Sequence, residues 1–341
     1  MAALLIGVAV SGRSEESFEA HSLSISESVV PINNNDRANR SRRFSFFELS
    51  DSDFIRAYER LSIRPTMAIM MTNFGISSAD DADTVEYQPN IRSRVGAAVG
   101  YRGVYLSGTL QLPGSEKETD IYGKTDSTDF QFNYHLRQTG CYLYYQNYKG
   151  FYTEKGGVIE TRPDIRLRGA GADLYFALNG RRFSWLAATG QSERQLKSAG
   201  SWIAMASAYY MSIDGDAPLV PAAYAADFGP IADLIDGEFF TLSGAAGYGY
   251  SYVFFDDFFI SGVGLLALGV QFHSYDFSTT HRSDEDIVMS PQLLLSAGWH
   301  TDRRAVSVSF FIKNNNVPID DATLTGMLFS AAFLYTHRFN I

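Results

Sequence analysis

Arginine residues stand two apart at two places in this chain of 341 residues. Arg92 and Arg94 form the first pair, and Arg166 and Arg168 form the second, which follows Asp164. Residues two apart on a β-strand point to the same face. If that face lines the interior of a barrel, the arginines either form an anion-selective constriction or pair with carboxylates across the lumen and lock the barrel.

Two further groups of polar residues are candidates for the same interior. Glu193, Arg194 and Lys197 make a mixed-charge cluster, and Asp129 and His135 alternate with aromatic residues over 129–136. Arginines that faced lipid would cost ~2–4 kcal/mol each at the bilayer midplane, which favours an inward orientation. The lumen of a barrel of about twelve strands is narrow, so we expect opposite charges inside it to pair with each other rather than to select ions. The candidate lumen residues are Arg92, Arg94, Asp129, His135, Arg166, Arg168, Glu193, Arg194 and Lys197.

A hydrolytic site would need a serine, a histidine base and an acidic or amide side chain that orients the base. The chain has six histidines and many serines, but no Gly-x-Ser-x-Gly motif. His135 shares its predicted face with Asp129, so a polar lumen network explains it. We therefore expect no enzyme, and keep a lipid-modifying hydrolase as an alternative. A Ser–His pair within about 3 Å on the outer rim would distinguish it.

Composition argues against several other kinds of site. A single cysteine excludes a four-cysteine zinc site or a disulfide framework. The acidic loop clusters, such as Asp284–Asp286, do not follow the twelve-residue calcium pattern, so neither a metal nor another cofactor is expected. A formal charge of −10 makes nucleic acid a poor partner.

The elements that position these side chains are predicted to be β-strands. From about residue 60 onward, apolar residues alternate with small or polar ones, as in 240–254, and strict alternation indicates strands. Asn179-Gly180 is the strongest hairpin signal, between strands expected at 173–178 and 182–188. Short turns that alternate with longer polar loops predict an up-and-down antiparallel meander.

The composition of the two strand faces decides the class of barrel. The polar face is mostly Gly, Ala, Ser, Thr and Gln, which suits a crowded interior. The other face carries aromatic clusters near strand ends, for example Tyr248, Tyr250 and Tyr252, which resemble interfacial girdles. The pattern predicts an all-β, transmembrane up-and-down antiparallel β-barrel, and a soluble barrel is the alternative.

The number of strands is less certain from the pattern. Thirteen segments read as strands: 61–75, 87–99, 103–112, 127–136, 141–149, 165–178, 182–189, 200–212, 238–254, 258–273, 287–301, 304–313 and 323–339. Single-chain bacterial barrels have an even number. Merging 182–212 gives twelve, which we predict, and adding a strand near 219–228 gives fourteen.

The ends of the chain suggest its compartment. Residues 1–12 are expected to be a shortened signal peptide, with a buried strand as the alternative. Residues 13–55 form a polar leader, and 56–341 form the barrel domain. The aromatic-rich last strand, Leu328–Phe339, is typical of chains read by the barrel-insertion machinery. We expect a monomer in the bacterial outer membrane, in contact with its lipid and lipopolysaccharide.

Several motifs together resemble a known family. They are Tyr87-Gln-Pro-Asn90, Lys124-Thr125, Asp129-Phe-Gln-Phe-Asn133, Tyr144-Tyr-Gln-Asn-Tyr-Lys-Gly-Phe-Tyr152, Arg162-Pro-Asp-Ile165, Asn179-Gly-Arg-Arg-Phe-Ser184, Gln191–Ser201 and Gly247-Tyr-Gly-Tyr250. Over about 55–340 the chain is similar to domain-of-unknown-function family 4421, outer-membrane barrels found mainly in Bacteroidota. The resemblance implies fold and location, and no catalytic residues. The expected role is a structural or interaction protein or a narrow pore, with a small-molecule transporter or porin as an alternative.

Overall fold

The computed structural model describes residues 51–57, 60–78, 83–91, 93–112, 116–189, 193–319 and 322–339. The described residues form one compact unit by themselves. The expected signal peptide at 1–12 lies outside the described residues, and so do 13–50 of the expected leader and Arg92. The predictions for those residues stay predictions.

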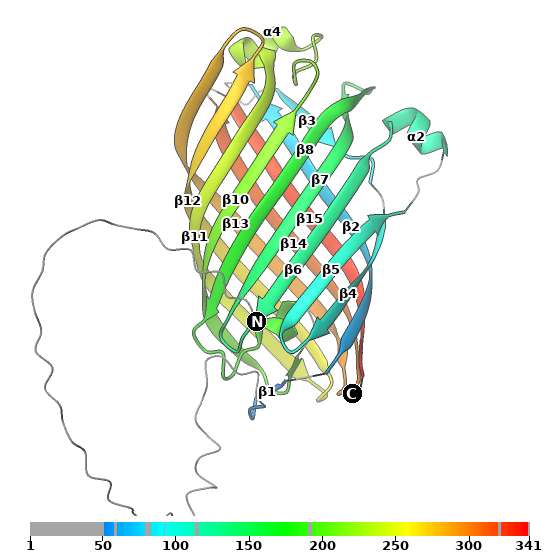
Figure 1. The fold of residues 1–341 in the computed structure, drawn as a ribbon, viewed down its shortest axis with the longest axis vertical. Helices are drawn as coiled ribbons and strands as arrows, with labels where there is room; N and C mark the ends of the chain where they lie inside the picture. Colours follow the sequence, from blue (N-terminus) through cyan, green and yellow to red (C-terminus); the bar gives the residue numbers. More distant parts are fainter. Residues whose placement is uncertain are drawn as a thin grey trace, which may run out of the picture. The chain divides into compact units, whose positions relative to one another are not determined.

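Twelve of the described strands close into a ring of antiparallel neighbours (Figure 1). They are β2 (Ser62–Ser77), β4 (Arg94–Tyr101), β5 (Val104–Gln111), β6 (Asp126–His135), β7 (Thr139–Lys155), β8 (Val158–Ala177), β10 (Ala199–Asp214), β11 (Leu234–Phe254), β12 (Phe258–Phe277), β13 (His281–His300), β14 (Arg304–Ile319) and β15 (Ala322–Arg338). The last strand pairs with the first, Leu328 opposite Thr72, which removes the sheet edges. The predicted up-and-down barrel of twelve strands is confirmed.

The remaining described elements lie at the two ends of the barrel. Strand β3 (Thr84–Gln88) pairs with β2 and β7 beyond the short strands β4–β6. Strands β1 (Ile55–Arg56) and β9 (Arg194–Gln195) form a separate two-stranded sheet. The helices are α2 (Glu116–Tyr122), α3 (Trp185–Thr189), α4 (Ala225–Phe228) and the 3-10 helix η2 (Gly229–Asp233).

The count of twelve arises differently from the prediction. Residues 182–189 are not a strand; they form a turn and helix α3, because Phe183 and Trp185–Ala188 are all buried and cannot alternate between two faces. The alternative strand near 219–228 is also wrong, since that segment leads into α4. The single strand expected over 87–99 is divided into β3 and β4, which are separated at Pro89.

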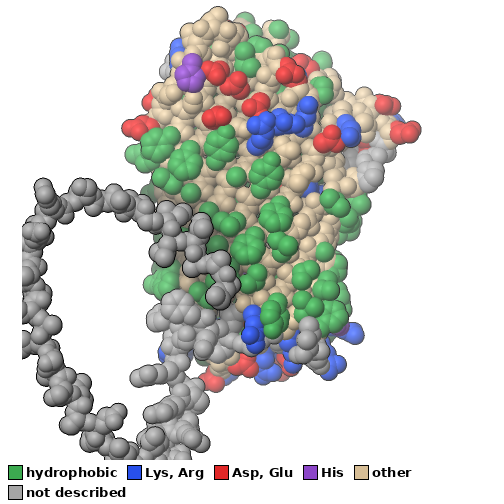
Figure 2. Space-filling view, in the orientation of Figure 1, with side chains coloured by type: hydrophobic (Ala, Val, Ile, Leu, Met, Phe, Trp, Pro, Cys, Tyr) green, Lys and Arg blue, Asp and Glu red, His purple; other side chains and the backbone are tan. Residues whose placement is uncertain are grey.

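The outer face of the ring carries large apolar side chains over its middle. Leu106, Leu143, Leu174, Leu268 and Phe310 are each between 45% and 59% exposed, and they come from strands all around the ring. Figure 2 shows hydrophobic side chains over the middle of the visible face, with charged side chains gathered at its two ends. This is the surface of a transmembrane β-barrel. No helix in the part of the chain described here is long and apolar enough to cross a membrane.

The inner face is crowded, as its small residues predict. Gly171 on β8 faces inward opposite Tyr144 on β7. A Cβ atom added at Gly171 would lie 2.3 Å from the Tyr144 ring, so only glycine lets the ring lie against the wall. We call the end with the hairpins at 101–104, 255–258 and 300–304 the lower end, and the other the upper end (Figure 1).

Candidate functional site: a chamber in the lumen

The lower end of the lumen is filled by the connection between β8 and β10. We call its described residues, 179–189 and 193–198, the plug. Helix α3 of the plug crosses the ring, because Trp185 Nε1 donates to the hydroxyl of Tyr142 on β7 while Ser296 Oγ on β13 donates to the Ala188 carbonyl over 2.6 Å. The Trp185 ring also stacks on inward-facing Tyr175, with centroids 4.6 Å apart. The plug is thus held from opposite walls.

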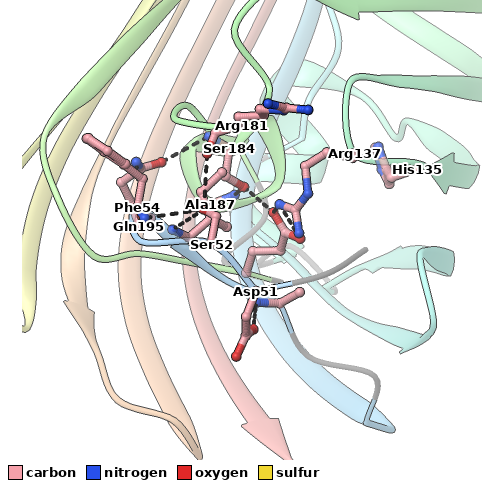
Figure 3. A network of polar contacts seen from close by, with 12 residues as sticks. Asp51, Ser52, Phe54, His135, Arg137, Arg181, Ser184, Ala187 and Gln195 are labelled. Carbon is pink, nitrogen blue, oxygen red and sulfur yellow. Dashed lines mark hydrogen bonds and ion pairs between the residues drawn. The ribbon is translucent and has the colours of Figure 1, made fainter. Parts of the chain in front are cut away.

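A buried ion pair fixes the plug to the β6–β7 hairpin. Arg137 Nη1 lies 3.1 Å from Glu193 Oε1, with the two side chains 3% and 4% exposed. Ser184 Oγ donates to the same carboxylate over 2.5 Å and accepts from the backbone N–H of Ala187, which caps α3 (Figure 3). Burial raises the pKa of Glu193 above its usual range, and the nearby Arg137 guanidinium and Ser184 hydroxyl oppose that rise.

Further contacts tie the plug to the lower hairpins and to the N-terminal side of the barrel. Arg194 binds Asp257 over 2.6 Å and Asp302 over 3.2 Å, which lie in two different hairpins. Strand β1 adds to β9 of the plug, Ile55 opposite Gln195. The Lys197 ammonium lies 5.5 Å from the ring centroid of Phe54. Phe54 itself lies beside Gln195 and Ser52 (Figure 3).

The upper end is closed by a different segment. Residues 215–233, which we call the cap, carry α4 and η2 and place Leu219, Val220, Phe228 and Ile231 in a buried cluster with side chains of β2, β3 and β7. Arg162 on β8 holds the cap, donating to the carbonyls of Ala217 and Pro218 over 2.9 and 2.8 Å. Asp164 fixes that guanidinium over 2.7 Å.

Between plug and cap the lumen keeps a cavity of about 410 Å³, which we call the chamber. Its wall on β5, β6 and β7 is polar, formed by Ser107, Thr109, Asp129, Gln131, Asn133, His135, Tyr144 and Gln146. Its wall on the other strands is largely apolar, formed by Met70, Met205, Met211, Val263, Leu265, Leu294, Phe311 and Leu328. Three charged side chains interrupt this second wall: Arg64 on β2, Asp173 on β8 and Lys313 on β14.

Two predicted site residues form one neutral pair at the chamber wall. Arg94, whose side chain is 0% exposed, pairs with Asp129 on β6. Its Nε donates to Thr109 Oγ1 over 2.9 Å and its Nη1 to Ser127 over 2.8 Å. Because these contacts occupy its donors, Arg94 links the neighbouring strands β4, β5 and β6. It does not present a free positive charge in a constriction. His135 lies deeper, its Nδ1 3.0 Å from the Tyr175 hydroxyl.

The other predicted residues are placed differently from one another. Glu193, Arg194 and Lys197 belong to the plug, below the chamber. Arg166 and Arg168 were expected inside the barrel, but they lie on its outer face. Side chains alternate along the continuous strand β8, and both arginines share the face of the exposed Leu174 and Phe176. The physical reason is that both lie above the apolar surface, where Arg168 pairs with Asp214 at 3.4 Å and 42% exposure, so lipid imposes no cost on them.

The cap was not predicted from the sequence, and Lys313 and Asp173 were not named as candidate lumen residues. Lys313 and Asp173 lie on the inner faces of their strands. The inward orientation of Lys313 could have been found from the alternation, because it shares a face with Ser307 and Ser309. Lys313 Nζ lies 5.5 Å from the ring centroid of Tyr209. Among the described residues, no carboxylate lies within 4.0 Å of that ammonium group.

A serine–histidine–aspartate arrangement lies at the upper rim, on the β12–β13 hairpin. His281 Nδ1 is 2.5 Å from Asp276 Oδ1, and its Nε2 is 3.3 Å from Ser274 Oγ and 3.4 Å from Ser283 Oγ. The assignment of donors depends on the histidine tautomer. His281 and Asp276 are 60% and 50% exposed on the outer face, so the geometry of a base and its orienting carboxylate is present on an open surface.

No group of three or more His, Cys, Asp or Glu side chains that could hold a metal occurs in the described ranges. The acidic residues of the lower hairpins serve other partners, since Asp257 and Asp302 bind Arg194. At the upper end, Asp83 binds Lys155 over 2.8 Å.

Comparisons with solved structures return outer-membrane barrels at low similarity. The toluene transporter TodX of P. putida is 7% identical, with a TM-score of 0.30, over 84% of this chain and 91% of that one. Ail, the attachment invasion locus protein of Yersinia pestis, is 13% identical with a TM-score of 0.26 over 58% and 97%. Outer-membrane expressed OmpT of Vibrio cholerae is 6% identical with a TM-score of 0.29 over 86% and 100%. Likenesses this distant carry no argument about the function of this chain.

No curated protein matches the chain. A family model does, over residues 49–336, which include the plug, the cap and every strand of the ring but for the last residues of β15. That model is described as a domain of unknown function. The chain therefore belongs to the family Domain of unknown function (DUF4421).

Proposed function

We propose that the protein is a bacterial outer-membrane β-barrel that acts as a gated narrow passage for small molecules. The apolar outer face and the closed twelve-strand ring support membrane insertion. In the bacterial envelope, the outer membrane is where such barrels reside. The lumen supports a passage that is shut at both ends, rather than a standing pore.

The observation that carries this proposal is the hollow chamber between two separate closures. A barrel with a purely structural role needs its lumen filled, since packed side chains stabilise the fold. Here about 410 Å³ stays open at mid-height. The closures are connecting segments rather than strands of the wall, so either can move without breaking the ring. Local opening is easiest in such segments.

If plug and cap close the same passage one after the other, both must be loosened before ions can pass. Arg137→Met removes a buried cation that helps to hold the plug, and Arg162→Met removes a cation that helps to hold the cap. Each single variant keeps one end closed, so its ion conductance in planar bilayers should stay near that of the wild type. The double variant should conduct strongly. Arg168→Met, which alters an exposed arginine of the same wall, is the matched control.

If the double variant inserts and folds but passes no current, the proposal of a passage is wrong, and a structural or interaction role remains for the protein. Heat-modifiable migration on gels establishes folding for each variant before its conductance is compared. Purification of the wild type as a monodisperse protein without detergent would contradict membrane insertion itself.

A second candidate function follows from the Asp276–His281–Ser274 arrangement. A histidine oriented by a carboxylate can activate a serine hydroxyl for attack on an ester. This rim lies outside the apolar band, where lipid headgroups are expected, so an outer-membrane lipid would be the substrate. A fluorophosphonate probe should label Ser274 in membranes, and Ser274→Ala or His281→Asn should abolish labelling. Ser283→Ala is the matched control, since Ser283 competes for the same nitrogen; labelling that is absent in the wild type excludes this candidate.

A further inference from the structure

The chamber has walls of opposite character, and this asymmetry selects a kind of ligand. Apart from Phe130, which is 47% exposed, the side chains with which β5 and β6 line it are polar or hydrogen-bonding. Strands β10, β12 and β13 contribute mainly apolar side chains, Met205, Met211, Val263, Leu265 and Leu294, beside Tyr209 and Gln292. A fully polar solute would make no favourable contact with the apolar wall. A hydrocarbon would leave buried polar groups without partners, which is costly. The walls therefore fit an amphipathic molecule.

The surroundings of Lys313 in the chamber favour an anionic group. Arg94 and Asp129 neutralise each other, and Asp173 is the anion that acts on Lys313, but no carboxylate of the described residues lies within 4.0 Å of the ammonium group. Lys313 Nζ lies 5.5 Å from the ring centroid of Tyr209 instead. An ammonium group binds a carboxylate more strongly than it binds a ring face. A ligand carboxylate at Lys313 would supply that partner.

The chamber also offers acceptors that need a donor, one on each of its walls. Asn133 is 7% exposed, and its Oδ1 has no hydrogen-bond partner among the described residues; the same holds for Oδ1 of Asp173. Both side chains line the chamber. A buried acceptor without a donor destabilises the protein unless a ligand or water donates to it. A hydroxyl at a distance from the ligand's carboxylate would do so.

We infer that the chamber binds a small amphipathic carboxylate that also carries a hydroxyl group. Lys313 binds the carboxylate, Asn133 or Asp173 accepts from the hydroxyl, and the methionine and leucine side chains contact the apolar body. The tyrosine pair Tyr144 and Tyr209, with ring centroids 6.0 Å apart, provides aromatic contact beside the cation. The volume lies within the ~300–1,000 Å³ of small-molecule pockets. This inference rests on the proposed passage, since it names what would pass.

Equilibrium binding tests the inference without requiring transport. Isothermal titration of the full chain in detergent uses 3-(4-hydroxyphenyl)propionate as the probe, with 3-phenylpropionate and 4-(3-hydroxypropyl)phenol as analogues that lack the hydroxyl or the charge. The probe should bind most tightly. Loss of the carboxylate should weaken binding by roughly ten- to hundredfold, as for hydrogen bonds to charged groups.

Variants assign the binding to the chamber. Lys313→Met should weaken binding of the probe by roughly tenfold or more, and Lys313→Gln serves if that variant fails to fold. Lys149→Met, an exposed lysine on β7, should leave binding unchanged. Asn133→Leu should reduce the preference for the probe over 3-phenylpropionate. Equal binding of the uncharged analogue, or an unchanged affinity in folded Lys313 variants, would overturn the inference.

Access to the chamber is controlled with the Arg137→Met/Arg162→Met variant, whose closures are loosened. Binding of the probe by this variant alone supports the inference, because a closed wild type excludes the ligand. Absence of binding by both proteins overturns it. If the double variant binds the probe but does not conduct, the proposed passage is contradicted and the ligand assignment stands. If it conducts but does not bind the probe, the ligand assignment is contradicted and the passage stands.

Discussion

Arg137 and Glu193 form an ion pair of 3.1 Å at the lower end of the lumen, where both side chains are almost completely buried. Arg137 belongs to a hairpin of the ring and Glu193 to the plug, so this one contact joins the wall to the segment that closes it. The carboxylate also receives the hydroxyl of Ser184, the residue that caps helix α3. Loss of the pair therefore affects the helix as well as the attachment of the plug.

Arg137→Met should loosen the plug without dissolving the barrel. Removing one partner of a buried ion pair costs about 3–5 kcal/mol, because the other charge stays buried alone. A cysteine introduced at Ala188 should then react faster with a soluble maleimide than it does in the otherwise wild-type protein. Arg137→Met/Glu193→Met restores an apolar contact and should recover much of the protection. A double variant as reactive as the single one would show that the pair does not hold the plug.

Release of the plug should depend on pH through Glu193. Burial raises its folded-state pKa above the unfolded value of about 4.3, so the folded protein holds this proton more tightly than the unfolded chain does. The stability from protonation is fully present below the unfolded pKa and is lost as pH rises through the raised folded pKa. Labelling at position 188 should therefore increase with pH across that interval, after correction for the intrinsic reactivity of the thiol. Glu193→Gln should abolish the dependence, and a dependence that survives would assign it to another group.

Arg94→Met should reduce the stability of the barrel rather than alter ion selectivity. Its guanidinium joins β4, β5 and β6 through Thr109, Ser127 and Asp129, and the loss leaves Asp129 without its cation, at a cost of about 3–5 kcal/mol. The temperature of heat-modifiable migration should fall. The exposed Arg168→Met is the control and should change it little. An unchanged transition with altered anion preference would support a selectivity role instead.

Gly171→Ala should destabilise the barrel by about 1–3 kcal/mol through overpacking. The added Cβ atom would meet the Tyr144 ring at 2.3 Å. At Gly244 a Cβ atom meets nothing within 4 Å, so Gly244→Ala is the matched control and should be near neutral. Urea unfolding in detergent measures both. Adding Tyr144→Ala to Gly171→Ala should relieve the clash, and failure of that rescue would point to a different origin of the loss.

The sequence was sufficient to predict the ring and insufficient to predict its contents. Alternation depends only on which face a side chain occupies, so β11 and β14 could be read directly from it. The plug has no such period, because Phe183 and Trp185 are enclosed by walls contributed by distant strands. Pairing of an inward arginine with a carboxylate was expected, but the identity of the pair, Arg94 with Asp129, depends on the order of neighbouring strands and came from the structure. Arg166 and Arg168 were misplaced because the cost of facing lipid, which favoured an inward orientation, applies only within the apolar band. Both lie above that band, and their height follows from the register of β8 with β10, which the sequence does not show.

The proposed function requires that plug and cap close one passage in series. Planar-bilayer conductance of Arg137→Met, Arg162→Met and their combination, each shown to be folded, tests this most directly. We expect each single variant to stay near the wild-type level and the combination to conduct strongly. A folded double variant with no conductance above the wild type would contradict it, as would a single variant that conducts as well as the double.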